Sequence, residues 1–185
     1  MKRLVVLFLI VASCAGAPKT SRVATSDRDR LFPFGTYRHK VDLTVKLNSE
    51  KNRSFKLDGI VDLREEKIQV IGISAFGTTE FKIVEDRKSG AISIEIYRDQ
   101  LKKAENRFRD YYSVLRRLLD AKMKRGADSE LVWAEFDETG PLKLTEARTG
   151  STFYLSQFDR NKIPTALEVH HREFSALIKV VGYEL

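Results

Sequence analysis

Two stretches in the first half of the chain alternate between apolar and polar residues, the first of them strictly. From Tyr37 to Leu47 every second residue is apolar or aromatic apart from His39, and the residues between them are charged or polar. The alternation resumes from Phe55 to Leu63, after a polar turn over 48–53. Because successive side chains of a strand face opposite sides, a period of two indicates a strand with one buried face. The two stretches therefore predict a long antiparallel hairpin.

The rest of the chain predicts more strands around one helix. Apolar residues spaced by three and four between Phe108 and Leu119 indicate an amphipathic helix, with Gly126 as the glycine that ends it. The expected order is five strands, one long helix and about five more strands, which is a mainly β (α+β) fold. The further strands are expected over 67–73, 79–84, 91–97, 130–136, 142–145, 152–158, 166–171 and 174–183.

An antiparallel sheet this wide has an apolar face that one helix covers only in part. We therefore expect a strongly curved sheet, a half-barrel, with the helix over its concave face. Two interiors satisfy this pattern: an apolar cavity beside the helix, or a completely packed core filled by the inward-facing aromatic side chains. If there is a cavity, its expected lining is Leu43, Val45, Phe55, Leu57, Val61, Tyr111, Leu115 and Leu118.

The N-terminus has the layout of a secretory signal peptide. Lys2 and Arg3 precede an apolar run over 4–12, which is too short to cross ~30 Å of hydrocarbon. The run ends in Val11-Ala12-Ser13-Cys14, which resembles a bacterial lipobox, the motif whose cysteine is lipidated and becomes the first residue of the mature protein. The alternative is a plain signal peptide cleaved near 15–17.

Cys14 is the only cysteine of the chain, so its lipidation would leave no thiol for disulfide or metal chemistry. We expect a signal peptide over 1–13, a lipidated N-terminus and flexible tether over 14–33, and a single domain over 34–185. No cofactor is expected besides the covalent lipid on Cys14.

The charge favours acidic surfaces. The chain has a formal net charge of +7, and removal of 1–13 takes away Lys2 and Arg3, which lowers the basic count from 33 to 31 against 26 acidic residues. Outside the cytoplasm, anionic headgroups are an abundant acidic surface, so we interpret the excess as affinity for membrane. Nucleic acid is not expected as a partner, and no glycine-rich phosphate motif is present in the sequence.

Residues that could carry catalysis have ordinary explanations. Ser74 lies in Gly72-x-Ser74-x-x-Gly77, whereas a hydrolase elbow needs glycine two residues after the serine. His170 and His171 are neighbours on a predicted strand, so their side chains point to opposite faces and cannot share a metal ion. His39 stands alone on an apolar face, as a structural histidine. We expect neither an enzyme nor a metal site.

The order of these features resembles the lipoprotein-localisation family, represented by LolA and LolB. The resemblance rests on the lipobox, the tether, the meander that includes 59–83, the central helix, and Ile163-Pro164 before the penultimate strand. It implies a half-barrel with a helical lid that holds acyl chains. It also implies that an apolar residue on a protruding loop between two central strands touches the membrane, and Phe76 within 72–77 is the residue at that place.

The function that follows is that of an envelope lipoprotein at the periplasmic face of the outer membrane. It would bind an acyl chain or lipoprotein anchor and help its transfer or insertion there. Ala15 follows the lipobox cysteine where an aspartate would favour retention at the inner membrane. The expected partners are the membrane, a lipid or lipoprotein acyl chain, and a periplasmic protein. The alternative is a structural or accessory envelope lipoprotein with a packed core that binds a protein partner.

Overall fold

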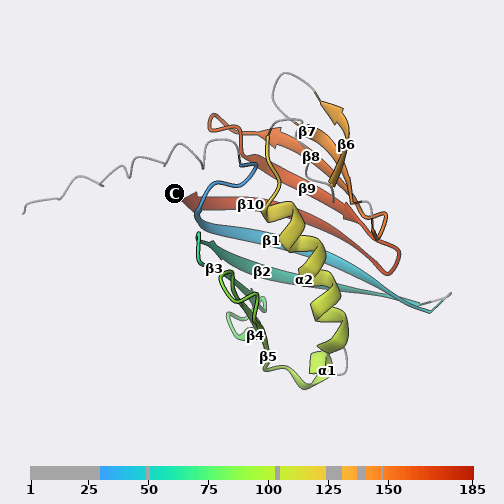
Figure 1. Ribbon diagram of the computed structural model, residues 1–185. Helices are drawn as coiled ribbons and strands as arrows, with labels where there is room; N and C mark the ends of the chain where they lie inside the picture. Colours follow the sequence, from blue (N-terminus) through green and yellow to red (C-terminus); the bar gives the residue numbers. More distant parts are fainter. Residues whose placement is uncertain (1–29, 49–50, 103–104, 124–130, 137–140, 147) are drawn as a thin grey trace, which may run out of the picture.

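The computed structural model describes residues 30–48, 51–102, 105–123, 131–136, 141–146 and 148–185. All strands in these ranges join one antiparallel sheet in the order β5-β4-β3-β2-β1-β10-β9-β8-β7-β6 (Figure 1). The prediction of a mainly β, antiparallel fold is confirmed. The elements are β1 (Gly35–Asn48), β2 (Lys51–Leu63), β3 (Lys67–Ile73), β4 (Thr79–Asp86), β5 (Ile92–Ile96), α1 (Asp99–Lys102), α2 (Glu105–Leu119), β6 (Leu131–Phe136), β7 (Pro141–Glu146), β8 (Thr152–Phe158), β9 (Pro164–His170) and β10 (Phe174–Glu184).

The sheet consists of two meanders that join at its centre. The first runs from β1 to β5 and the second from β6 to β10, and β1 pairs with β10 between them. The long helix α2 belongs to the connection between β5 and β6, the two edge strands of this open sheet. Figure 1 shows α2 crossing one face of the sheet, which bends around it.

The hairpin of β1 and β2 supplies the centre of the face that α2 covers. Its register runs from Gly35 opposite Leu63 to Asn48 opposite Lys51. Directly opposite residues of antiparallel strands share a face, so the inward residues of the two alternating stretches meet one another. The same row continues into the second meander, because Val45 also pairs with Phe174 of β10.

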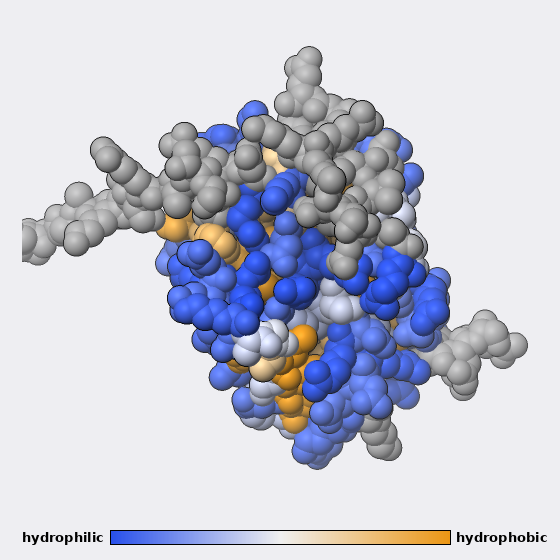
Figure 2. All heavy atoms as spheres, in the orientation of Figure 1, coloured by the Kyte–Doolittle hydropathy of each residue, from blue (hydrophilic) through white to orange (hydrophobic). Residues whose placement is uncertain are grey.

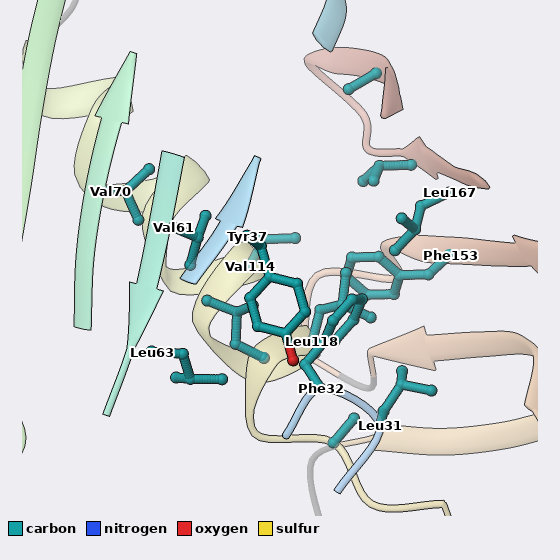
Figure 3. Packing of buried hydrophobic residues seen from close by; sticks show 14 of the residues in the cluster. Leu31, Phe32, Tyr37, Val61, Leu63, Val70, Val114, Leu118, Phe153 and Leu167 are labelled. Carbon is teal, nitrogen blue, oxygen red and sulfur yellow. The ribbon is translucent and has the colours of Figure 1, made fainter. Parts of the chain in front are cut away.

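A fully buried cluster fills the space between the sheet and the C-terminal end of α2. Tyr37 and Leu118 are 0% and 1% exposed, and the Tyr37 hydroxyl donates a hydrogen bond of 2.6 Å to the carbonyl oxygen of Pro33. The rings of Phe32 and Tyr37 pack edge to face at 5.6 Å. Figure 3 shows Leu118 meeting these rings together with Phe153 of the second meander. This end of the space under the helix is therefore sealed.

The helix ends at Leu119, so the predicted end near Gly126 is wrong. A segment far away in the sequence donates hydrogen bonds to the carbonyl oxygens at the end of α2 and just after it. The guanidinium of Arg30 donates to the carbonyl oxygen of Leu119 at 2.9 Å, and the amide of Leu31 donates to the carbonyl oxygen of Ala121 at 2.8 Å. Residue spacing along the helix carries no information about such a distant partner. Gly126 itself lies outside the described residues.

The packed structure extends further toward the N-terminus than the expected domain start at residue 34. Leu31 and Phe32, expected in the tether, are 0% and 2% exposed. Their apolar side chains complete the sealed cluster, so the residues from Arg30 onward belong to the fold. The expected signal peptide, the lipobox and Cys14 lie outside the described residues.

Buried polar groups fix α2 against β4. Glu85 is 1% exposed and accepts hydrogen bonds from the Tyr112 hydroxyl at 2.5 Å and from Nε of Arg116 at 2.7 Å. Burial and the adjacent Glu85 carboxylate both raise the pKa of Tyr112 far above its usual range, so its hydroxyl stays a donor. Asp120 pairs with Arg87 at 2.8 Å. Because the buried Glu85 carboxylate has these hydrogen-bond partners, it holds α2 in one position against β4.

Replacing Tyr112 by phenylalanine is expected to lower the free energy of unfolding by about 1–3 kcal/mol, because the buried Glu85 carboxylate loses a hydrogen-bond donor. Urea unfolding of the two proteins measures the difference. Tyr97→Phe is the matched control: its hydroxyl also donates to a carboxylate, Glu95, at 2.5 Å, but that pair is exposed. The control should change stability by under ~0.5 kcal/mol. Equal effects of the two substitutions would show that burial of Glu85 does not govern the interaction.

Candidate functional site

The core beneath α2 is not completely packed. A cavity of about 450 Å³ lies between the helix and the sheet. Its size falls within the range of small-molecule pockets, ~300–1,000 Å³. Most of the lining residues are aliphatic or aromatic. The whole lining is formed by Phe32, His39, Val41, Leu43, Val45, Arg53, Phe55, Leu57, Asp58, Gly59, Val61, Val70, Ile71, Gly72, Phe81, Ile83, Arg98, Leu101, Arg107, Phe108, Tyr111, Tyr112, Val114, Leu115, Leu118, Leu119, Phe153, Leu167, Val169, Phe174, Ala176 and Ile178.

The structure brings together all eight residues that the sequence offered as cavity lining. They come from β1, β2 and α2, and they are Leu43, Val45, Phe55, Leu57, Val61, Tyr111, Leu115 and Leu118. Of the two interiors that the alternation allows, the described residues adopt the one with a cavity.

The second meander closes the other side of the cavity, and its contribution was not predicted. Phe153, Leu167 and Val169 line it from β8 and β9. The side chains of β8 alternate between the two faces of the sheet, since Phe153 and Leu155 are both buried while Tyr154 is exposed. What the sequence lacks is the strand order. Only the pairing of β1 with β10 places these strands beside the first hairpin.

Two paired glycines form part of the cavity wall. Gly59 of β2 lies opposite Gly72 of β3, in a row that continues to His39 on one side and Phe81 on the other. A Cβ atom on Gly72 would lie 2.1 Å from Cε1 of Phe81, so the phenylalanine ring occupies that space. A Cβ on Gly59 would meet only Cβ of His39 at 3.7 Å and Cγ2 of Val41 at 3.8 Å. The missing side chain of Gly59 therefore leaves room in the cavity.

His39 is the polar residue of this row, and it is uncharged at neutral pH. It is 8% exposed, and its ring stacks on Tyr37 at 6.2 Å. Burial among apolar side chains disfavours the imidazolium and lowers the pKa of His39 from 6.5 to about 4. The inner part of the cavity thus offers an apolar, uncharged environment, which suits a hydrocarbon chain better than a polar ligand.

The cavity opens to solvent near the N-terminal half of α2. Phe108 and Leu101 are partly exposed there, and three arginines surround them: Arg53, Arg98 and Arg107. We call these five residues the cavity mouth. Figure 2 shows apolar atoms at the surface in a stripe between α2 and the β4–β5 side, within a mostly hydrophilic face. The opposite end, at Phe32, is sealed.

Phe76 is the most exposed large apolar side chain among the described residues, at 97%. It lies in the turn between β3 and β4, where the hydroxyl of Ser74 accepts hydrogen bonds from the amides of Phe76 at 3.3 Å and Thr78 at 3.2 Å. Ser74 therefore has a structural role in this turn. Since β3 and β1 both run antiparallel to β2, the turn points to the same end of the sheet as the cavity mouth.

The remaining residues considered for metal binding have other partners. His170 is exposed and bonds Glu168 at 2.8 Å, whereas the ring of His171 accepts a hydrogen bond from the amide of Glu173. Within the described ranges, no three histidine, cysteine or acidic side chains are grouped to hold a metal ion. In the same ranges, no helix has the length and apolar character needed to span a membrane.

Known proteins resemble this chain in structure and not in sequence. No protein-family model matches it, and no curated protein matches it. It is similar in structure to a domain from Vibrio parahaemolyticus described as an outer membrane lipoprotein-sorting protein, with 9% identity, a TM-score of 0.41, and 86% of this chain and 88% of that chain covered. It is also similar to a LolA superfamily protein from Nitrosomonas europaea, with 8% identity, a TM-score of 0.40, and 88% of this chain and 91% of that chain covered.

Proposed function

We propose that this chain is a carrier that shelters the apolar chain of a lipid or lipoprotein in the cavity beneath α2. The cavity is the observation that supports the proposal most strongly. It is lined by apolar side chains from both meanders, it is sealed at the Phe32 end, and it opens at the mouth. A hydrocarbon chain entering it would leave water for an apolar site, at about 25 cal/mol per Å² of buried apolar surface.

The proposal also includes the location of the carrier in the cell envelope. The lipobox-like segment ending in Cys14 would attach the mature chain to a bilayer through the residues before Arg30, and Ala15 favours the outer membrane. Attachment would keep the cavity mouth within reach of the membrane surface that supplies or receives the ligand. The role would then be to bind an acyl chain or lipoprotein anchor and assist its transfer or insertion at the periplasmic face of the outer membrane.

A probe titration tests ligand binding directly. The full chain carrying Cys14→Ser, which cannot be lipidated, is titrated with an apolar dye whose fluorescence rises when it leaves water. We expect a saturable rise that unlabelled fatty acid reverses. If the folded protein gives no rise above that of an inert globular protein, it has no accessible apolar site and the carrier proposal fails.

Phe76 is proposed as the residue that touches the membrane during transfer. We expect Phe76→Glu to lower the rate at which bound lipid passes to vesicles, because a carboxylate does not enter the apolar part of the bilayer. The side chain is 97% exposed, so the substitution should leave stability within ~0.5 kcal/mol. Transfer of a fluorescent fatty acid to vesicles measures the rate. Phe76→Leu, which keeps an apolar tip, is the control, and equal rates for all three proteins would remove this turn from the mechanism.

The alternative function, an accessory lipoprotein that binds a protein partner, depended on a completely packed core. The cavity among the described residues favours a carrier over that alternative. A carrier is therefore the function that the geometry supports best.

A further inference from the structure

We propose that the ligand of this cavity is an anionic amphiphile, with its apolar chain under α2 and its carboxylate or phosphate group held at the mouth by Arg53 and Arg107. This inference rests on the proposed carrier function and specifies the class of lipid that the carrier takes. It comes from the placement of the two arginines, from the residues around them, and from the lack of an ion-pair partner for either one among the described residues.

Arg53 is a charged residue at a position where the strand pattern calls for an apolar one. It lies opposite Val45 of β1, and Val45 lies opposite Phe174 of β10. Paired residues share a face, and both Val45 and Phe174 are buried on the concave side. Arg53 therefore belongs to the inward row of β2 that continues through Phe55 and Leu57, and it lines the cavity at the end of that row.

Arg107 reaches the same region from the helix. It is half-buried, lines the cavity, and precedes Tyr111 by one helical turn, so the two side chains lie on the same face of α2. The ring of Tyr111 packs against that of Phe174 at 4.5 Å. Phe174 therefore lies between the two arginines. Across the strands, Arg53 is followed by Val45 and then by Phe174. On the helix side, Phe174 contacts Tyr111, which lies one turn after Arg107.

Two of the three arginines at the mouth form no ion pair with a described residue. Arg98 is compensated, since its Nη1 donates to both carboxylate oxygens of Glu80 at 3.2 Å. Arg53 and Arg107 have no carboxylate within ion-pair distance among the described residues. Asp58, the acidic residue of the lining, lies opposite Lys40 on the outward row.

Two carboxylates act on Tyr111 from nearby, Asp110 and Glu173, but neither belongs to the cavity lining. Burial raises the pKa of Tyr111, against the opposing effect of Arg107, so its hydroxyl stays protonated. That hydroxyl is buried beside the Arg107 guanidinium, and it donates to no acceptor among the described residues. A headgroup oxygen bound by Arg107 could also accept a bond from this donor, which would supply the acceptor that it lacks among the described residues.

The chemistry of the two arginines selects the headgroup. A guanidinium is planar, always charged and matched to two oxygens of a carboxylate or phosphate. An amphiphile with an acidic head satisfies both requirements of the site, an apolar interior and a cationic mouth. A neutral diacyl or monoacyl lipid would fill the interior but give neither guanidinium the anionic partner that it lacks among the described residues.

Three probes with the same chain separate these possibilities: oleate, oleoyl lysophosphatidylglycerol and mono-oleoylglycerol, each below its micelle concentration. They compete with the apolar dye for the full chain carrying Cys14→Ser and for the same chain carrying Arg53→Gln and Arg107→Gln in addition. We expect one or both anionic probes to bind at least tenfold more tightly than mono-oleoylglycerol at low salt. The double substitution should weaken the anionic probes by about tenfold or more and leave mono-oleoylglycerol unchanged.

Arg109→Gln is the matched control, since Arg109 is an exposed arginine of the same helix outside the lining. It should change none of the affinities, and Arg53→Lys with Arg107→Lys should restore part of the anionic preference. The relative affinities of oleate and the lysophospholipid show whether the head is a carboxylate or a phosphate. If all three probes bind equally, and equally to the double variant, the headgroup inference is wrong while the carrier function stands. If no probe binds, the carrier function itself fails.

Discussion

Replacing Gly59 by leucine is expected to weaken binding of the apolar dye by about tenfold to a hundredfold without lowering the stability of the protein. The new side chain would enter the cavity, since a Cβ at this position meets only His39 and Val41 at ordinary contact distances. Forcing a ligand into space already taken costs about 1–3 kcal/mol, and each ~1.4 kcal/mol is tenfold in affinity. The substitution also removes a glycine from the interior of β2, which should raise the free energy of unfolding by about 0.5–1 kcal/mol.

The measurement pairs a dye titration with thermal unfolding of the same samples. Gly182→Leu is the control, because Gly182 also lies within a strand and a Cβ added there would meet no atom within 4 Å, yet it does not line the cavity. It should leave dye affinity unchanged. If Gly59→Leu binds the dye as tightly as the wild type does, the dye site is not the cavity. Gly72→Ala should behave differently from both, losing stability because the ring of Phe81 occupies the place of its Cβ.

Acidification is expected to remove about 3 kcal/mol of stability through His39 alone. The pKa of this histidine is lowered by burial from 6.5 to about 4, and each pKa unit corresponds to ~1.36 kcal/mol. Between these two values the unfolded chain binds a proton that the folded chain does not, so protons favour unfolding. The stability that neutral His39 provides is therefore present above pH 6.5, falls as the pH is lowered toward 4, and changes little below that value.

Urea unfolding at a series of pH values from 7.5 to about 4 tests this effect. His39→Leu, which keeps the site apolar and cannot take up a proton, should lose that part of the pH dependence. His170→Leu, a change at an exposed histidine, should keep the wild-type slope. If His39→Leu and the wild type lose stability in parallel, the buried imidazole does not carry the acid sensitivity of the fold.

Strand periodicity predicted much of this fold because one face of the sheet is buried. Alternation over 37–47 and 55–63 placed β1 and β2 and their inward residues. The end of α2 and the role of Leu31 and Phe32 could not be predicted in the same way. Both depend on the amide of Leu31 meeting the carbonyl oxygen of Ala121, a contact across 90 positions that leaves no local pattern.

Periodicity likewise predicted one part of the candidate site and not the other. Its helix and hairpin side follows from periodicity, as Leu43, Leu115 and Leu118 illustrate. The space above Gly59 and the inward direction of Arg53 follow from register and strand order. A glycine in a strand and an arginine near a hairpin turn look ordinary in the sequence, and only pairing with Gly72 and Val45 shows what each does in the cavity.

The location of a bound chain is the most direct test of the carrier function. An oleate analogue with a photoreactive diazirine at its methyl end, bound to the full chain carrying Cys14→Ser, is irradiated and the labelled peptides are mapped by mass spectrometry. We expect label at the sealed end of the cavity, on the peptides that carry Phe32, Leu118 and Leu167. Label confined to exposed apolar residues outside the cavity, such as Leu177 and Val181, would contradict the proposed function.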